Sequence, residues 1–356
     1  VEQAEKKSLP KTVIKLTDEI YQKGEKEKNS PQMLKAYAWR MKYREMLNPD
    51  SLYAGLKGLE QWVKQTDQPM DRAILHSLIA EIYANYAANN QWQLRQRTEI
   101  VGQTPSADIR EWTANMFVEK VRTNVKEALA DSVLLLKTSS RDYIPFVELG
   151  KTSEYYHHDL YHLLASRGID ALLQVEKLGS GYTETNAVNP VKQDIIAIYG
   201  NMLSAYKAAG LKEGYVLTAL NYLEWRRGAE RYIRPLQAKG EASVLTDDTY
   251  LKALNTLKSK YASEPICAEV YLAQARSAIE KQQQVNALQL CDEAIRLYPG
   301  YRRINALKNL REEILAPYLN VYAADQAFPN EEIELRASHK NLDGFTVRIY
   351  QAKRLI

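Results

Sequence analysis

The sequence contains few of the features that mark several large classes of protein. Of its 356 residues only two are cysteine, Cys267 and Cys291. Two cysteines cannot form the framework of bridges that holds small secreted domains together, and we expect both to be free, small apolar side chains. No apolar run approaches the roughly 20 residues that span a membrane. The opening residues, VEQAEKKSLPK, lack the apolar centre of a secretory leader, and the compartment stays open.

An excess of charge of one sign is also missing. The chain has 48 basic and 44 acidic residues and a net charge of +4, and the two signs alternate along most segments. This pattern is typical of solvated helix faces and does not indicate a nucleic-acid surface. A glycine-rich phosphate loop is absent, because GSGYTET lacks the required lysine and Gly179 and Gly181 are isolated. No spacing supports a Ser/His/Asp constellation.

Helical periodicity is present in block after block. In residues 71–88, DRAILHSLIAEIYANYAA, apolar residues recur at steps of three and four, and the same spacing continues through residues 117–136, from Val118 to Val133. Prolines punctuate these blocks, since proline suits the first helical turn and damages a helix interior. Three prolines follow a residue that favours the N-cap position: Pro31 after Ser30, Pro49 after Asn48, and Pro190 after Asn189.

The clearest helix pair covers residues 268–300, AEVYLAQARSAIEKQQQVNALQLCDEAIRLYPG. Two helices joined at EKQQQ resemble one tetratricopeptide repeat, with Ala275, Ala287 and Ala294 where the helices approach closely. Residues 302–317 predict a following helix, and residues 30–47, 51–65 and 71–88 predict helices of similar length. We therefore predict a mainly α fold, a tetratricopeptide-like α-solenoid, over residues 1–316. Loops are expected at residues 178–190 and 239–248, with a sub-boundary near 179–190.

After Pro317 the period of apolar alternation changes from 3.6 to 2. The runs YLNVYAA, EIELRAS and GFTVRIYQ predict three strands, with turn residues at 341–344 between the last two. Two or three strands are too few for an independently stable sheet. We therefore expect residues 317–356 to be the first, incomplete part of a larger β-domain.

The segment FPNEEIELRASHKNLDGFTVRIYQA resembles the opening of the first macroglobulin-type β-sandwich in bacterial alpha-2-macroglobulin-like proteins. In that family a strand leads into a KNL or RNL segment, here Lys340, Asn341 and Leu342, and then into a strand that ends in an aromatic residue, here Tyr350. Some members carry a long helical segment ahead of this domain, where residues 1–316 stand. The resemblance implies a periplasmic or outer-membrane-anchored protein, its anchor outside this chain, that entraps foreign proteases.

The family's reactive centre does not carry over to this chain. That centre is a thioester made from a Cys-x-Glu-Gln run, and the two cysteines here stand in CAEV and CDEA, which lack the glutamine. We therefore predict a non-catalytic scaffold or interaction region without a cofactor. Its partners would be proteins, either proteases or the remaining domains of the full-length protein.

Two alternative functions belong to other classes of protein. A helical-repeat lipoprotein that captures glycans would present exposed tryptophan clusters on loops, and the five tryptophans here fall mostly within predicted helices. A zinc hydrolase would use HDLYH, an H-D-x-x-H variant of the zinc motif. There His158 and His162 would share one metal from one helix, and Asp159 would activate water. The ordinary interpretation of HDLYH is an amphipathic helix with polar tips outward, so no metal site is predicted.

Two compositional features remain. Residues 221–240 gather Arg226, Arg227, Arg231 and Arg234 near Trp225 and Tyr232, and the sequence offers Glu224 and Glu230 as partners at helical spacing. We interpret this segment as an ion-pair face and not as a base-stacking surface. The chain also has 24 tyrosines against four phenylalanines. Tyrosine suits half-buried helix packing, and some of a tyrosine-rich concave surface is expected to contact a partner.

Overall fold

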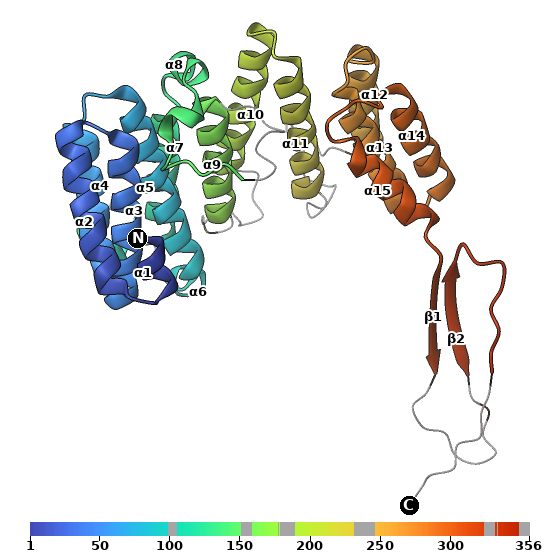
Figure 1. Cartoon of the computed structure of the whole chain (residues 1–356), viewed down its shortest axis with the longest axis horizontal. Coiled ribbons are helices and arrows are strands. Elements are labelled where there is room, and N and C mark those ends of the chain that lie inside the picture. Colours follow the sequence, from blue (N-terminus) through green and yellow to red (C-terminus); the bar gives the residue numbers. More distant parts are fainter. Residues whose placement is uncertain are drawn as a thin grey trace, which may run out of the picture. The chain divides into compact units, whose positions relative to one another are not determined.

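The computed structural model describes residues 1–98, 105–150, 159–176, 178, 189–230, 246–323, 332 and 334–348. It is mainly helical, with a two-stranded antiparallel sheet near the carboxyl end (Figure 1). The chain divides into two compact units, Val1–Ala219 and Leu220–Ile356. Among the described helices none is both long and apolar enough to cross a membrane.

The named elements of the first unit, in the part of it that the structure describes, are helices and 3₁₀ turns. They are α1 (Glu2–Lys6), α2 (Pro10–Glu27), α3 (Ser30–Leu47), α4 (Ser51–Gln65), α5 (Pro69–Asn89), α6 (Gln91–Arg95), α7 (Ala114–Ala128), α8 (Ser132–Lys137), α9 (Leu160–Val175), α10 (Pro190–Ala208) and the start of α11 (Lys212–Glu230), with single 3₁₀ turns η1 (Ile109–Glu111) and η2 (Ser140–Tyr143).

Helix α5 is the centre of this unit. It packs against α4, α7 and α9, and its apolar side chains Ile74, Leu75 and Ala84 are fully buried. The aromatic face of Tyr83 stacks on Trp112, with ring centroids 5.3 Å apart. The buried residues of α5 are distributed around the helix, and burial of its apolar side chains among α4, α7 and α9 is a main favourable term in the stability of the unit.

The described residues of the second unit contain the end of α11, four further helices and the sheet. Their bounds are α12 (Asp247–Lys260), α13 (Cys267–Glu280), α14 (Gln284–Leu297), α15 (Ile304–Leu315), β1 (Tyr318–Ala323) and β2 (Leu335–Lys340). Ala275 on α13 and Ala287 and Ala294 on α14 are 0% exposed, which confirms that these small residues lie where the two helices meet. A regular solenoid stays a prediction.

The strands β1 and β2 form a two-stranded ribbon, with Tyr318 opposite Lys340 and Ala323 opposite Leu335. Five of the six residues in each strand are exposed. The ribbon is anchored to α15: the Asn341 amide Nδ2 donates to the carbonyl oxygens of Ile314 at 2.7 Å and Ala316 at 3.2 Å. Asn341 thereby satisfies two of the carbonyls that a helix terminus leaves without intrahelical partners.

The proline pattern predicted the positions of several helices correctly. It predicted only some of their N-cap residues. The predicted bounds of α3 and α4 are confirmed, and Asn189 caps α10 through the N–H of Val191. Helix α3, however, is capped by Asn29, whose side chain accepts the N–H of Gln32, while Ser30 is its first residue. Asn48 ends α3 and does not begin α4.

Two other predictions were wrong in detail. The periodic segment from Val118 to Val133 is not one helix: α7 ends at Ala128, and Asp131 starts α8 by accepting the N–H of Leu134. Residues 344–348 of the third predicted strand are not in a strand, and its remainder lies outside the described residues. Most of the predicted loops at 178–190 and 239–248 also lies outside them.

Candidate functional site

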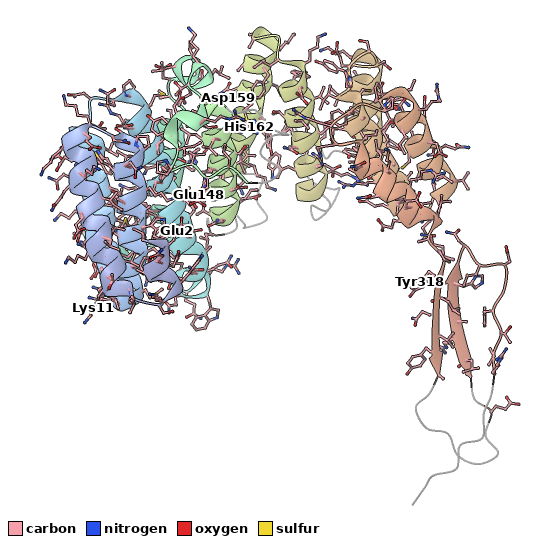
Figure 2. All side chains as sticks on the ribbon, viewed as in Figure 1. Glu2, Lys11, Glu148, Asp159, His162 and Tyr318 are labelled. Carbon is pink, nitrogen blue, oxygen red and sulfur yellow. The ribbon has the colours of Figure 1, made fainter. Side chains whose placement is uncertain are left out.

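The HDLYH segment does not form the predicted helical pair of histidines. Helix α9 begins at Leu160, and Asp159 is its N-cap, with Oδ1 accepting the His162 backbone N–H at 2.6 Å (Figure 2). The expectation that one helix holds both histidines is therefore wrong, because aspartate favours the cap position and α9 starts only at Leu160. His158 itself lies outside the described residues.

His162 is directed to a neighbouring helix. Its Nδ1 lies 2.8 Å from the hydroxyl of Tyr206 on α10, and Tyr206 is completely buried. Burial, together with nearby Asp159, raises the pKa of Tyr206, so its hydroxyl stays protonated. The described residues contain no group of three or more His, Cys, Asp or Glu side chains with metal-ligand geometry.

The arginine-rich segment forms an inter-helix network around Arg227. The Arg227 side chain is 6% exposed, and it pairs with Asp247 of α12 at 3.1 Å and Glu280 of α13 at 2.7 Å. Its guanidinium lies 4.7 Å from the ring centroid of Tyr250, whose hydroxyl donates to Glu224. The ion-pair interpretation is confirmed for Arg227, but the partners come from other helices and not from Glu224. Arg231, Tyr232 and Arg234 lie outside the described residues.

Many tyrosine hydroxyls join segments that are distant in the sequence. Examples are Tyr37 to the Gly55 carbonyl, Tyr83 to Glu60, Tyr143 to Asp71, Tyr298 to the Ala262 carbonyl and Tyr301 to Glu269. These contacts confirm helix packing as the role of these residues. The expectation that other tyrosines face a partner stays a prediction.

Both cysteines are free and buried, as expected from the sequence. Burial raises the pKa of Cys267, and burial together with Asp292 raises the pKa of Cys291 to about 11. A thiolate is the reactive form of cysteine, so these two side chains are packing residues at neutral pH.

The tryptophans do not gather on loops. Trp92 is 72% exposed on the short helix α6, Trp112 is buried, and Trp39, Trp62 and Trp225 are half-buried. This distribution does not match the clustered tryptophans that a glycan-capture surface would present.

Several apolar side chains of the ribbon are exposed. Tyr322 is 69% exposed, and Tyr318, Leu319, Val321 and Leu335 are exposed as well. Because successive side chains of a strand point to opposite faces, Leu319 and Tyr322 lie on opposite faces, and apolar groups therefore face solvent on both.

A pocket of about 250 Å³ lies among α12, α13 and α14. Its walls include Gln274 and Ser277 of α13 and the lysines Lys258 and Lys281. None of these residues stood out in the sequence. The sequence signal that could have indicated the pocket is the pair of polar residues beside the buried Ala275 and Ala278 on α13. Polar residues at such positions become informative only when the neighbouring helices are in place.

No protein-family model, curated protein or solved structure matches this chain.

Proposed function

We propose that this chain is a non-catalytic helical interaction scaffold of a large alpha-2-macroglobulin-like envelope protein that takes part in protease entrapment. The observation that supports this proposal best is the ribbon β1–β2. Both of its faces carry exposed apolar side chains, among them Leu319, Val321 and Tyr322, and a lone two-stranded ribbon is at best marginally stable in water. Further β structure that covers these side chains would remove this exposure.

The residues of the resemblance occupy a junction. Lys340 donates to the Glu313 carbonyl at 2.8 Å, and Asn341 binds the carbonyls at the end of α15. The segment that resembles the family's KNL motif thus joins the helical part to the β part. This arrangement supports the proposal that the helical segment fixes the position at which a macroglobulin-type domain begins.

The helical part has the properties of a scaffold. Side chains that could serve chemistry are engaged in contacts between helices, as with His162 and Tyr206 or Arg227 and its two carboxylates. Buried, hydrogen-bonded polar networks of this kind hold neighbouring helices in one arrangement. The protein would act in the periplasm or on the outer membrane, held by an anchor outside this chain, with proteases or its own further domains as partners.

Hydrogen exchange tests the structural half of the proposal. We compare the present chain with a product extended through the residues that its gene encodes after Ile356. In the extended product the amides of β1 and β2 should exchange at least about tenfold more slowly, because covering strands protect them from local opening. Exchange in α5, in the first unit, should not change and is the internal control. Equal rates in the ribbon would refute the proposal.

Protease assays test the functional half. Trypsin mixed with the extended product should digest casein more slowly and a small chromogenic peptide at its normal rate, since an entrapped protease remains open only to small substrates. Trypsin with the present chain alone should digest both normally. If the extended product slows neither reaction, or slows both equally, entrapment is not its role.

A further inference from the structure

The pocket among α12, α13 and α14 has the composition of a binding site. Asn255 and Lys258 line it from α12, Gln274 and Ser277 from α13, Lys281 from the turn after α13, and Asn286 from the first turn of α14. On α12 and α13 these residues recur at steps of three or four, so each helix turns one polar face to the pocket. All of them belong to the second unit.

Two buried oxygens in the wall have no hydrogen-bond partner among the described residues. They are Gln274 Oε1 and Ser277 Oγ, on residues that are 7% and 1% exposed. Gln274 Nε2 donates to Asn255 Oδ1 at 2.7 Å, which fixes the orientation of the amide and leaves Oε1 as an acceptor. A buried polar atom without a partner destabilises the fold, and a ligand that supplies a donor removes that cost.

Two ammonium groups supply positive charge at the same pocket. Lys258 Nζ lies 3.6 Å from Glu293, and Lys281 Nζ lies 3.8 Å from Asp247. Both distances are too long for a hydrogen bond, and a lysine carries three N–H donors. The first turn of α14 also opens here, and Gln283 makes no side-chain cap to it. The positive end of that helix dipole adds to the attraction for an anion.

These groups define the chemistry of the occupant. It must donate an N–H to the Gln274 oxygen and present a carboxylate to the lysines, within a space below the range of about 300–1,000 Å³ typical of drug-sized ligands. A fully ionised phosphate monoester has no hydrogen-bond donor for the Gln274 oxygen, and a neutral sugar has no charge for the lysines. An acidic residue in an extended peptide has both groups at the right scale.

We propose that this pocket binds a glutamate or aspartate residue in an extended segment of a partner protein. The backbone N–H of the bound segment donates to Gln274 Oε1, and its carboxylate accepts from Lys258 and Lys281. Ser277 supplies a further hydrogen bond inside the pocket. This assignment concerns the second unit alone and does not depend on the macroglobulin kinship.

Peptide pools test it. The immobilised full chain is exposed to two pools of seven-residue peptides with random flanks, one with glutamate and one with glutamine at the central position. We expect the glutamate pool to be retained about tenfold more strongly, the value of one charge-assisted hydrogen bond. The difference should shrink as salt rises, since an exposed ion pair is screened.

Two variants test whether the peptides bind in the pocket. Lys281→Gln and Ser277→Ala should each lower retention of the glutamate pool several-fold. Lys252→Gln, an exposed position on α12 outside the pocket, removes the same charge and should leave retention unchanged. Ser277→Ala removes a hydroxyl without a partner, so its Tm should not fall, and a loss of binding in this variant cannot come from unfolding.

Each contrary outcome overturns the proposal. Equal retention of the two pools removes the acidic specificity, and unchanged retention in both Lys281→Gln and Ser277→Ala moves the binding elsewhere. If free glutamate at a concentration matched to the pool displaces the peptides completely, the pocket recognises a small anion and not a protein segment. None of these outcomes bears on the ribbon, so the scaffold proposal stands or falls separately.

Discussion

At the scale of single residues, tyrosine hydroxyls connect helices that are far apart in the chain. Tyr143 of η2 donates to Asp71 of α5 at 2.9 Å, and Ser30 of α3 donates to the same carboxylate at 2.5 Å. Asp71 is buried, so three elements meet at one anion. Burying a carboxylate is acceptable only because these donors satisfy it.

Tyr143→Phe should therefore lower the free energy of unfolding of the first unit by about 1–2 kcal/mol, because Asp71 loses one of its two donors. Urea unfolding followed by circular dichroism measures the change. Tyr21→Phe is the control: its hydroxyl makes no hydrogen bond in the described part of the chain, and its removal should change stability by less than about 0.5 kcal/mol. Equal effects of the two changes would show that the bond to Asp71 contributes nothing.

The two cysteines give a prediction about reactivity. Because burial together with Asp292 raises the pKa of Cys291 to about 11, and burial raises the pKa of Cys267 above its usual value, both thiols are mainly protonated at pH 8. Ellman's reagent should therefore react slowly with the native protein at pH 8, and with two thiols at once in guanidinium chloride. Rapid reaction of either thiol in the native state would contradict the burial of both.

At the scale of elements, glycine sets the distance between two helices of the first unit. A Cβ added to Gly168 on α9 would lie 2.8 Å from Val125 Cγ1 on α7, whereas one added to Gly200 on α10 would meet nothing within 4 Å. Gly168→Ala should destabilise the unit by about 1–3 kcal/mol through overpacking. Gly200→Ala should stabilise it by about 0.5–1 kcal/mol through helix propensity.

Thermal unfolding of the two alanine variants measures this contrast, and each is the control for the other. Opposite shifts in Tm are expected. A Tm that does not fall in Gly168→Ala would mean that α7 and α9 are not in close contact at Gly168.

The junction between α15 and β2 is the second element with a testable role. Asn341→Ala removes two hydrogen bonds to α15 and places alanine at a φ of 52°, a left-handed backbone that disfavours side chains with a Cβ. Amides of β2 should exchange several-fold faster. Glycine tolerates this φ, so Asn341→Gly separates the two effects. If the lost hydrogen bonds are the cause, the β2 amides of Asn341→Gly should exchange as fast as those of the alanine variant. The β2 amides of Asp343→Ala, a change at a neighbouring exposed position, should exchange at the normal rate.

How far the elements could be predicted depends on where their boundaries are encoded. The bounds of α3 and α4 follow from local punctuation, and the close approach of α13 and α14 follows from Ala275, Ala287 and Ala294. The break before Asp131 was missed because apolar periodicity continues across it, and the Asp131 cap that starts α8 acts only locally against that pattern. The helix start at Asp159 was missed for the same reason.

At the scale of the whole molecule, the chain divides into two compact units, Val1–Ala219 and Leu220–Ile356. Tyr143→Phe should then shift the unfolding of the first unit alone. Tyr250→Phe, which removes the hydroxyl bonded to Glu224 in the second unit, should shift the other transition. Differential scanning calorimetry of both variants and of the unchanged chain resolves the two. A single transition displaced equally by either change would mean that the units unfold together.

The candidate pocket forms only where three helices come together, which explains why the sequence did not reveal it. Gln274 and Ser277 are ordinary polar residues on a helix, and Lys258 and Lys281 are ordinary surface charges until α12, α13 and α14 come together. Periodicity reports which face of a helix is buried, not which buried atoms are left without partners. The ribbon could be predicted because the alternation of apolar and polar residues that indicates a strand lies within each strand's own sequence.

The attachment of the ribbon has a mechanical consequence. β1 follows α15 after Ala316 and Pro317, and β2 returns to the end of the same helix through Lys340 and Asn341. A force applied along the ribbon is therefore transmitted through both strands to the same point, the last turn of α15. Helix α15 packs on α13 and α14. A partner that holds β1 and β2 can therefore transmit force to α15 and to the helices that α15 contacts.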